Sequence, residues 1–442
     1  MARTIAPAGI TPAGKTILTT FAGRRDRMAL LTRYARAALA RGIVDEWHVW
    51  DFARDPADAR WLREEFPSVR MTPGHGLEYF SAPVRLRPGA EAGMLRCSVA
   101  ATSDVHIGLR RLSGEGPSYE IVLGGWSNQA CAIRVFDDPA QLVEPERRHA
   151  EIAVQTAATP NLLPEWGFAD VGVTVRPDGL AALVNGRVAI AHQVPIPAGE
   201  FSVLYRSGFG ADAEWRFAGE PAHGAYLFKS TPTRPFYLPY YRHYARQLPS
   251  YEDDIFLKCD DDIVFIDMDG LRRFIAFRHA NPQYFMLSAN VVNNGVCAYF
   301  QQENGVFPRA ALDLELPPNG LCGSLWESGA KAAALHDIFL RDPGAFLAAG
   351  ETVTEWNARL SINFIALRGA DFVHVPDLME DDEHFLSYGG RVRSRRPNAI
   401  YHPFTVAHLT FLTQEHAFDH ARILAGYAAL ATQCGVPAPG VA

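Results

Sequence analysis

The sequence predicts an α/β domain that is split by an inserted all-β sandwich. Strand and helix signals alternate over residues 15–66, whereas short alternating strands separated by turn residues follow from about residue 79. Helical signals return after residue 218, and surface loops tolerate insertions whose ends lie close together. We therefore expect three segments, residues 1–78, 79–218 and 219–442, of which the first and third form one catalytic domain.

The N-terminal segment contains signals for two strands and two helices. β-Rich runs and helical spacing of apolar side chains alternate over residues 15–21, 24–42, 45–52 and 55–66. This alternation predicts a parallel sheet covered by helices. Ligands bind beyond the carboxyl ends of the strands in such sheets, which here means Thr20, Phe21, Ala22 and Asp51.

The middle segment has the pattern of an antiparallel sandwich. Alternating runs occupy residues 104–112, 119–125 and 131–136. The steps Pro177-Asp178-Gly179 and Asn185-Gly186 predict tight hairpins, because glycine accepts the positive φ that such turns require. We expect an all-β module between residues 79 and 218.

Charge and cysteine content exclude several classes of protein. The chain has 42 basic and 49 acidic residues, a formal net charge of -7, so no global positive field recruits nucleic acid. Its 6 cysteines form no Cys-x-x-Cys pair, which argues against a zinc knuckle or a small disulfide framework. No run has the length of a signal-peptide core or a membrane span, so we expect a cytoplasmic protein with at most a peripheral association with membranes.

Three adjacent carboxylates, Asp260, Asp261 and Asp262, stand between the apolar runs 256–259 and 263–266. At a separation of about 5 Å and an effective dielectric near 20, each pair repels by about 3 kcal/mol. A hard divalent cation such as Mn²⁺ or Mg²⁺ relieves this repulsion and prefers oxygen ligands. The alternative is a solvated acidic loop, but the flanking apolar runs favour a position at the edge of a sheet.

A strand that ends in Asp-Asp-Asp after a strand–helix–strand–helix unit resembles the DxD motif of GT-A-fold glycosyltransferases. The resemblance implies a Rossmann-like catalytic domain of GT-A type in which Asp260 and Asp262 hold Mn²⁺ or Mg²⁺, with Asp260 and Asp261 beside the nucleotide. It implies a hexosyltransferase of the inverting type that moves a sugar from a nucleotide-sugar donor, with a UDP-sugar favoured, to a glycan acceptor. The implied process is the synthesis of surface polysaccharides or glycoconjugates.

The same resemblance implies roles for residues near the C-terminus. His408, in an apolar strand-like run, resembles the histidine that completes the metal shell in many of these enzymes. Asp382, or its neighbour Asp381, stands ahead of a helix where an inverting enzyme keeps its general base. The alternatives are a hydrogen-bonded core histidine and an acidic helix N-cap.

Five further residues are candidates for contacts with the ligands. Arg24 and Arg27 follow the first strand and could pair with donor phosphates, or could face water from the first turn of a helix. Trp326 and Glu327, in a glycine-rich loop, could stack on a sugar ring and bind its hydroxyls. Asn290 lies in a strand that ends in paired asparagines and could bind the donor sugar, although an ordinary turn explains the same letters.

Residues 263–271 also resemble the signature of haloacid dehalogenase-type phosphatases. That resemblance implies Asp267 as the nucleophile, Asp269 as the acid/base, and Asp381 with Asp382 as magnesium ligands. Leu271 departs from the threonine or valine usual in that family. We favour Asp267 or Asp269 as the cap of the helix that follows.

The run from Tyr119 to Trp126, followed by Asn128 and Arg134, resembles the farnesoic acid O-methyltransferase-like domain over residues 79–218. No glycine-rich cofactor loop follows a strand here, so methyl transfer is not supported and carbohydrate or partner binding is the better expectation. Stacking faces or core positions are expected for Trp126, Trp166 and Trp215. The alternative function for the whole chain is accordingly a carbohydrate-binding or scaffold protein without turnover.

Overall fold

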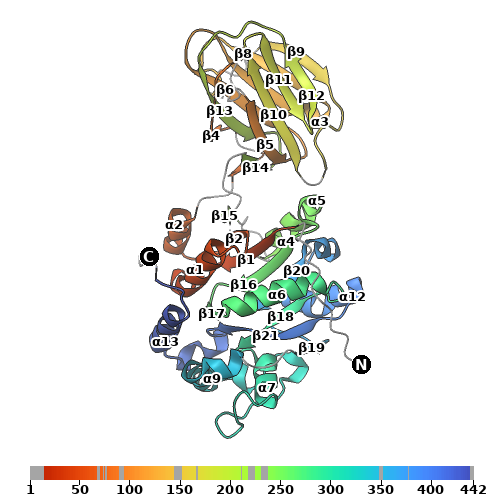
Figure 1. Cartoon of the computed structure of the whole chain (residues 1–442). Coiled ribbons are helices and arrows are strands. Elements are labelled where there is room, and N and C mark those ends of the chain that lie inside the picture. Colours follow the sequence, from red (N-terminus) through yellow and green to blue (C-terminus); the bar gives the residue numbers. More distant parts are fainter. Residues whose placement is uncertain are drawn as a thin grey trace. The chain divides into compact units, whose positions relative to one another are not determined.

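The computed structural model has two compact units (Figure 1). It describes residues 14–66, 70–72, 74, 77–88, 94–143, 152–165, 168–210, 212–217, 224–229, 237–347, 352–376 and 378–438. Unit 1 comprises Met1–Ser68, Ala222–Ala245 and Tyr251–Ala442, and unit 2 comprises Val69–Pro221 with Arg246–Ser250. Three segments that are separated in the sequence therefore share one unit.

Unit 1 is built on a nine-stranded sheet. The strand order is β15-β2-β1-β16-β20-β18-β21-β17, with β19 paired to β21. The strands are β1 (Thr16–Ala22), β2 (Glu46–Asp51), β15 (Gly224–Lys229), β16 (Ile255–Asp260), β17 (Ile263–Ile266), β18 (Leu287–Val292), β19 (Val353–Glu355), β20 (Phe364–Arg368) and β21 (Ala399–His408).

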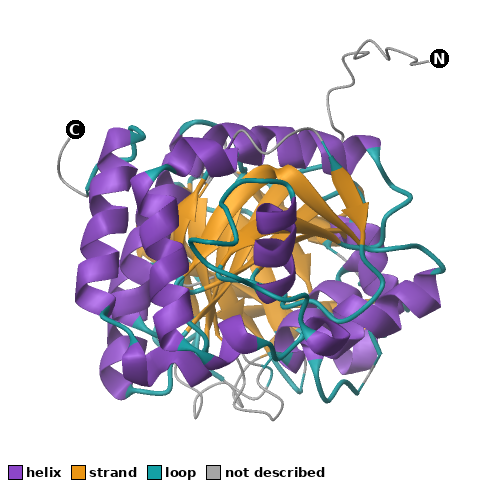
Figure 2. Cartoon of the chain, turned by 90° about the horizontal axis from the view of Figure 1, so that it is seen from below, coloured by secondary structure: helices purple, strands orange, loops and turns teal. Residues whose placement is uncertain are grey.

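Helices lie on both sides of this sheet (Figure 2). The helices outside the sandwich are α1 (Arg25–Ala40), α2 (Pro56–Glu65), α4 (Leu238–Arg246), α5 (Leu248–Tyr251), α6 (Met268–Ala280), α7 (Gly295–Glu303), α8 (Ser324–Glu327), α9 (Gly329–Arg341), α10 (Pro343–Leu347), α11 (Asp382–His384), α12 (Gly390–Ser394) and α13 (His420–Gln433). Shorter helical turns are η3 (Pro318–Gly320), η4 (Gly369–His374), η5 (Phe385–Gly389) and η6 (Leu412–Ala417).

Local sequence explains where the first elements begin. The Asp55 side chain caps α2 by accepting a hydrogen bond from the Ala57 amide at 2.6 Å, and Pro56 occupies the first turn, where its missing N–H costs nothing. On α1, Met28, Leu31 and Ala35 recur at helical spacing and are all fully buried. The apolar face of α1 therefore supplies part of the core of unit 1.

The predicted fold class, a Rossmann-like GT-A-type domain with a parallel sheet, is corrected by this topology. Parallel pairing joins β15, β2, β1 and β16, but β20 is antiparallel to both β16 and β18, and β17 and β19 are antiparallel to β21. The apolar runs on either side of the triple aspartate, β16 and β17, lie far apart in the strand order. The spacing of apolar residues indicates that a strand exists but does not specify its neighbour.

Unit 2 is a sandwich of two six-stranded sheets, ordered β12-β11-β10-β5-β14-β3 and β4-β13-β6-β7-β8-β9. Its elements are β3 (Arg70–Thr72), β4 (Phe80–Leu86), β5 (Met94–Ala100), β6 (Val105–Ser113), β7 (Ser118–Gly124), α3 (Gly125–Asn128), β8 (Ala130–Phe136), β9 (Ile152–Ala158), β10 (Ala169–Arg176), β11 (Gly179–Val184), β12 (Arg187–His192), β13 (Glu200–Ser207) and β14 (Ala213–Phe217). Asn185 and Gly186, with φ of 49° and 76°, form the turn between β11 and β12. Trp215 lies in the core between the sheets, and its indole N–H donates to Thr72 Oγ1 at 2.8 Å. Trp166 lies outside the described residues.

Among the helices that the structure describes, none combines the length and the apolar character needed to cross a bilayer.

Candidate functional site

Two of the three adjacent aspartates meet a histidine from the other end of the chain. Asp260 ends β16, His408 ends β21, and Ile263, the first residue of β17, pairs with His408 across the sheet. His408 Nε2 lies 3.1 Å from Asp262 Oδ1 and 4.0 Å from Asp260 Oδ2. One ligand atom from each of these three residues lies within 4.8 Å of the other two.

The donor set of Asp260, Asp262 and His408 fits a divalent cation. Two carboxylates and an imidazole nitrogen suit Mn²⁺ or Mg²⁺. His408 Nε2 and Asp262 Oδ1, 3.1 Å apart, are within hydrogen-bond distance of each other, and all three ligand atoms are close enough together to share one cation. Buried Asp262 and partly exposed Asp260 would hold the cation with one side open.

Asp261 points away from this cluster and toward the end of β1. It accepts hydrogen bonds from the Gly23 amide at 3.0 Å and from Arg24 Nη2 at 2.6 Å. The same Arg24 nitrogen lies 3.0 Å from Asp262 Oδ2, so one guanidinium screens both carboxylates. Arg24 therefore contacts the acidic cluster directly.

The charges in this cluster shift one another's pKa values. Burial alone would raise the pKa of Asp262, but His408 and then Arg24 lower it to about 2. Burial raises the pKa of Asp261, and the Asp262 charge adds to this effect. For His408, burial opposes the charged form, yet the neighbouring Asp262 raises the pKa above 6.5.

Asp382 and Asp381 occupy different environments. Asp382 is half-buried and accepts a hydrogen bond from the Tyr241 hydroxyl at 3.0 Å. Burial raises its pKa, and the charges of Asp260 and Asp381 add to this effect. Asp381 instead pairs with Arg359 Nη2 at 2.6 Å and caps α11 by accepting from the His384 amide. Of the two predicted bases, Asp382 has the environment that suits a proton acceptor.

The predicted ligand-binding edge of β1 and β2 is largely filled by side chains. Thr20 and Ala22 are fully buried, and the Thr20 hydroxyl accepts from the Trp47 indole N–H at 3.0 Å. Phe21 stacks on Phe52 at 4.6 Å between ring centroids. Thr20 and Ala22 therefore present no surface to a ligand.

Two more predicted ligand contacts at this edge have partners within the protein. Asp51 Oδ1 accepts from the Ala53 amide at 3.1 Å in the turn after β2. Arg27 is buried, donates to Thr410 Oγ1 at 2.9 Å and pairs with Glu415 at 3.0 Å. Arg27 therefore ties α1 to the segment after β21.

The remaining predicted residues are spread over unit 1. Asn290 is fully buried and accepts from Gln301 Nε2 at 2.9 Å, so it lies in the core. Trp326 is half-buried and Glu327 exposed in the short helix α8. Asp267 caps α6 by accepting from the Asp269 amide at 3.2 Å, the role favoured over a phosphatase nucleophile.

Trp126 stands at an unusual backbone turn in unit 2. Trp126, Ser127 and Asn128 have φ of 53°, 59° and 64°, a left-handed turn that follows β7. For residues with a Cβ this conformation costs about 1–2 kcal/mol each. The Asn128 side chain closes the turn by donating to the Leu163 carbonyl at 2.8 Å and accepting from its amide at 3.0 Å. The turn leaves 56% of the Trp126 surface exposed.

A hollow of about 340 Å³ lies beside this turn. It is lined by Ser103, Asp104, His106, Val122, Gly125, Trp126, Ser127, Arg134 and Phe209. Phe209 is 78% exposed and, like Trp126, has a positive φ, here 54°. Two exposed aromatic rings and several polar side chains therefore share one concave surface.

A buried carboxylate organises the polar wall of this hollow. Glu120 is 0% exposed and accepts from Arg134 Nη1 at 2.7 Å, from Arg206 Nη2 at 3.1 Å and from the Tyr79 hydroxyl. His106 Nδ1 lies 2.9 Å from both Glu120 Oε1 and Arg206 Nη2. The strand register brings them together, because Arg206 pairs with His106 and Glu120 pairs with Arg134. His106 Nε2 has no hydrogen-bond partner among the described residues.

We expect the stability of unit 2 to fall in acid. Burial lowers the pKa of His106 below 6.5, so the unfolded chain binds a proton that the folded chain does not, and stability decreases as the pH falls below 6.5. Burial alone would raise the pKa of Glu120, but His106, Arg206 and Arg134 hold it well below 4.5, so its stabilisation is lost as the pH falls further. Urea unfolding between about pH 7.5 and pH 2.5 tests this. A Glu120→Gln variant should lose the part of the pH dependence below 4.5, and a wild-type stability that rises toward acid would contradict the expectation.

Several residues around these sites were not predicted from the sequence. Lys258, whose Nζ lies 3.5 Å from Asp260 Oδ1, stands two residues before Asp260 in the sequence. Tyr241, which donates to Asp382, lies in α4. In unit 2, His106, Glu120 and Arg206 occupy strand positions that alternate with the core residues. Polar side chains at every second position of adjacent strands were the signal that could have revealed them.

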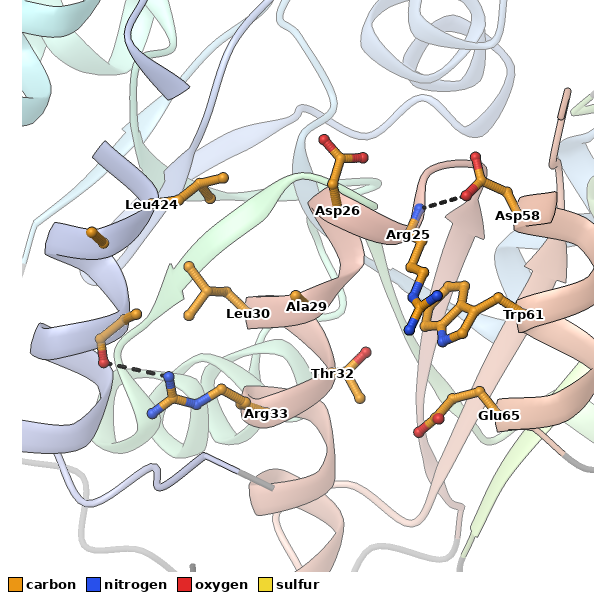
Figure 3. Close-up of a pocket in the computed structure, with 12 residues that line it drawn as sticks. Arg25, Asp26, Ala29, Leu30, Thr32, Arg33, Asp58, Trp61, Glu65 and Leu424 are labelled. Carbon is orange, nitrogen blue, oxygen red and sulfur yellow. Dashed lines mark hydrogen bonds between the residues drawn. The ribbon is translucent and has the colours of Figure 1, made fainter. Parts of the chain in front are cut away.

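Unit 1 also has a groove of about 830 Å³ over α1, between α2 and α13 (Figure 3). The Arg25 guanidinium covers the Trp61 ring at 5.9 Å, and the Arg25 amide donates to Asp58 at 3.3 Å. Apolar residues such as Leu30 and Leu424 line the opposite part of the groove. None of the predicted site residues lines it.

Comparison with known proteins gives matches for unit 2. The family model for farnesoic acid O-methyl transferase matches residues 75–220. No curated protein matches the chain. Similar solved structures include a carbohydrate-binding module of Bacillus subtilis (9% identity, 31% of this chain and 77% of that chain, TM-score 0.23) and sheep galectin-11 in complex with glycerol (9%, 35% and 96%, 0.20). A Bacillus subtilis protein of unknown function with a galectin-like fold also aligns (9%, 37% and 90%, 0.25). At these TM-scores the structural likeness supports no conclusion.

These comparisons correct the predicted glycosyltransferase. The matching family model describes another family, the one that residues 119–134 resemble, and no curated protein matches the chain, so no comparison supports a glycosyltransferase. The GT-A resemblance, the inverting hexosyltransferase activity, the nucleotide-sugar donor and the role in polysaccharide synthesis therefore lose their support. A three-residue acidic motif is short enough to recur without that activity. The family model matches less than half of the chain, so this chain resembles that family only over residues 75–220.

Proposed function

We propose that unit 2 binds a carbohydrate in the hollow beside Trp126. The observation that carries this proposal is the exposed indole of Trp126, held by a left-handed turn. Strained backbone persists where the surrounding structure enforces it and often marks a binding site. An indole offers an apolar face for a sugar ring and an N–H for a hydroxyl.

The rest of the hollow offers complementary polar groups. Asp104 and Arg134 line the hollow with a carboxylate and a guanidinium, and His106 also lines it, with a buried ring nitrogen that has no protein partner among the described residues. Sugar hydroxyls both donate and accept hydrogen bonds, so this mixture suits them. A volume of about 340 Å³ lies within the range of small-molecule sites.

Replacing Trp126 with alanine should weaken glycan binding by about 30-fold, equivalent to about 2 kcal/mol, as for an aromatic hot spot. Stability should change little, because the side chain is 56% exposed. The measurement is a screen of the full-length protein on immobilised oligosaccharides, followed by calorimetry with the best ligand.

Tyr388→Ala is the matched control, because Tyr388 is a half-exposed aromatic residue of unit 1. It should bind the glycan as the wild type does. No glycan binding by the wild type, or equal binding by wild type and Trp126→Ala, would refute the proposal.

As a second candidate we propose that unit 1 binds Mn²⁺ or Mg²⁺ through Asp260, Asp262 and His408. The spacing of their ligand atoms favours this function. A cation with few protein ligands keeps positions for water or for a phosphate-bearing ligand, and Asp382 would lie ready to accept a proton nearby. Electron paramagnetic resonance tests this directly: the signal of free Mn²⁺ should decrease with one equivalent of protein, and excess Mg²⁺ should restore it. An unchanged Mn²⁺ signal would overturn the proposal.

A further inference from the structure

We infer that the paired asparagines Asn293 and Asn294, acting with Asn363 and Gln414, position the ligands of the proposed cation site. This inference rests on the proposed cation binding. These four side chains are all buried in unit 1. They form two separate amide bridges, one leading to Asp260 and the other to the chain immediately after His408.

The first bridge runs from α7 to Asp260. Asn363 Nδ2 donates to Asp260 Oδ2 at 3.0 Å, and the Asn363 carbonyl accepts from the Asp260 amide at 2.9 Å. Asn294 Nδ2 in turn donates to Asn363 Oδ1 at 3.0 Å. The donor to Asp260 Oδ2 is therefore a planar amide whose own oxygen is held in place. This fixes the orientation of the partly exposed carboxylate.

Asn294 is itself held in place by α7. Its side-chain oxygen caps this helix by accepting from the Cys297 amide at 3.3 Å. Its Nδ2 has a second contact, to the Ser361 carbonyl at 3.1 Å. Asp260 is thus tied through two amides to the start of a helix, which is a rigid anchor.

The second bridge holds the turn that follows His408. Asn293 Nδ2 donates to the Leu409 carbonyl at 3.0 Å and to Gln414 Oε1 at 2.9 Å, while Gln414 Nε2 returns a bond to Asn293 Oδ1 at 3.1 Å. Asn293 has φ of 66°, a left-handed conformation that asparagine tolerates better than most residues. The backbone turns at this residue, and the neighbouring side chains of Asn293 and Asn294 join different bridges.

Residues that orient metal ligands typically change metal affinity by 10–100-fold when they are replaced. Asn363→Leu, which has the same branched side-chain shape but no donor, should therefore weaken Mn²⁺ binding about 10–100-fold. Asn294→Ser retains a side chain that caps α7 but removes the amide donor to Asn363, so it should weaken binding less, by several-fold. Both are measured by Mn²⁺ titration with paramagnetic resonance, alongside unfolding without metal.

Gln301→Met is the matched control. It breaks another buried amide pair, Gln301 with Asn290, which within the described part of the chain makes no hydrogen bond to the cation ligands, so it should lower stability without changing Mn²⁺ affinity. If both asparagine variants bind Mn²⁺ as tightly as the wild type, the inference about the amide bridges is wrong, but the proposed cation site is not refuted. If Asn363→Leu does not fold, Asn294→Ser decides alone. If the wild type binds no Mn²⁺, the cation site itself is refuted.

Discussion

Asp262→Asn is expected to abolish detectable Mn²⁺ binding by unit 1. Asp262 is the most buried carboxylate of the proposed site, and His408 and Arg24 hold its pKa at about 2, so it is ionised at neutral pH. An amide retains the shape of the side chain but removes the negative charge that attracts a cation. A ligand at 100 times its dissociation constant adds about 2.7 kcal/mol of stability, so the wild type should unfold at higher temperature with Mn²⁺ and the variant should not.

Asp261→Asn provides the control for position and charge. It removes one carboxylate of the same acidic run, but Asp261 faces Gly23 and Arg24 rather than His408. We expect this variant to keep its stabilisation by Mn²⁺. Equal losses in the two variants would mean that general acidity, and not the cluster with His408, attracts the cation. Circular dichroism confirms whether each variant is folded.

Glu120→Gln is expected to destabilise unit 2 by about 3–5 kcal/mol, because it leaves the buried guanidinium of Arg206 without its counter-charge. Glu120 is fully buried and bonds Arg134 and Arg206 at 2.7 and 3.1 Å. The loss should appear in urea unfolding, and hydrogen exchange followed by mass spectrometry should locate it in β6, β7 and β8. Glycan binding should weaken too, because Arg134 and His106 line the hollow.

Glu200→Gln is a suitable comparison within the same unit. Glu200 pairs with Arg85 and Arg87 at 3.3 Å in both cases, and both arginines are well exposed. Exposed ion pairs contribute about 0–1 kcal/mol, so this variant should be almost as stable as the wild type. A similar small loss for Glu120→Gln would show that the buried network contributes little to stability.

Much of the local structure could be predicted from the sequence. The period of apolar residues identified the strands and helices near residues 16–65, and the Asn185-Gly186 step specified its hairpin. These features depend on residues that are neighbours in the chain, so the local sequence is enough to predict them. Strand pairing depends on residues that are distant in the chain. The sequence therefore predicted neither the mixed sheet nor the separation of β16 from β17 in the strand order.

For the candidate sites too, the sequence determined some features and the tertiary structure determined others. The sequence alone determined that acidic residues follow an apolar strand and that Trp126 follows a glycine pair. Only the tertiary structure decided that Asp262 faces His408 while Asp261 faces Arg24, and that Trp126 is exposed while Trp215 is buried. Ligand geometry and burial depend on which distant segments pack together. That packing is determined by the whole core, so it cannot be derived from a short segment of the sequence.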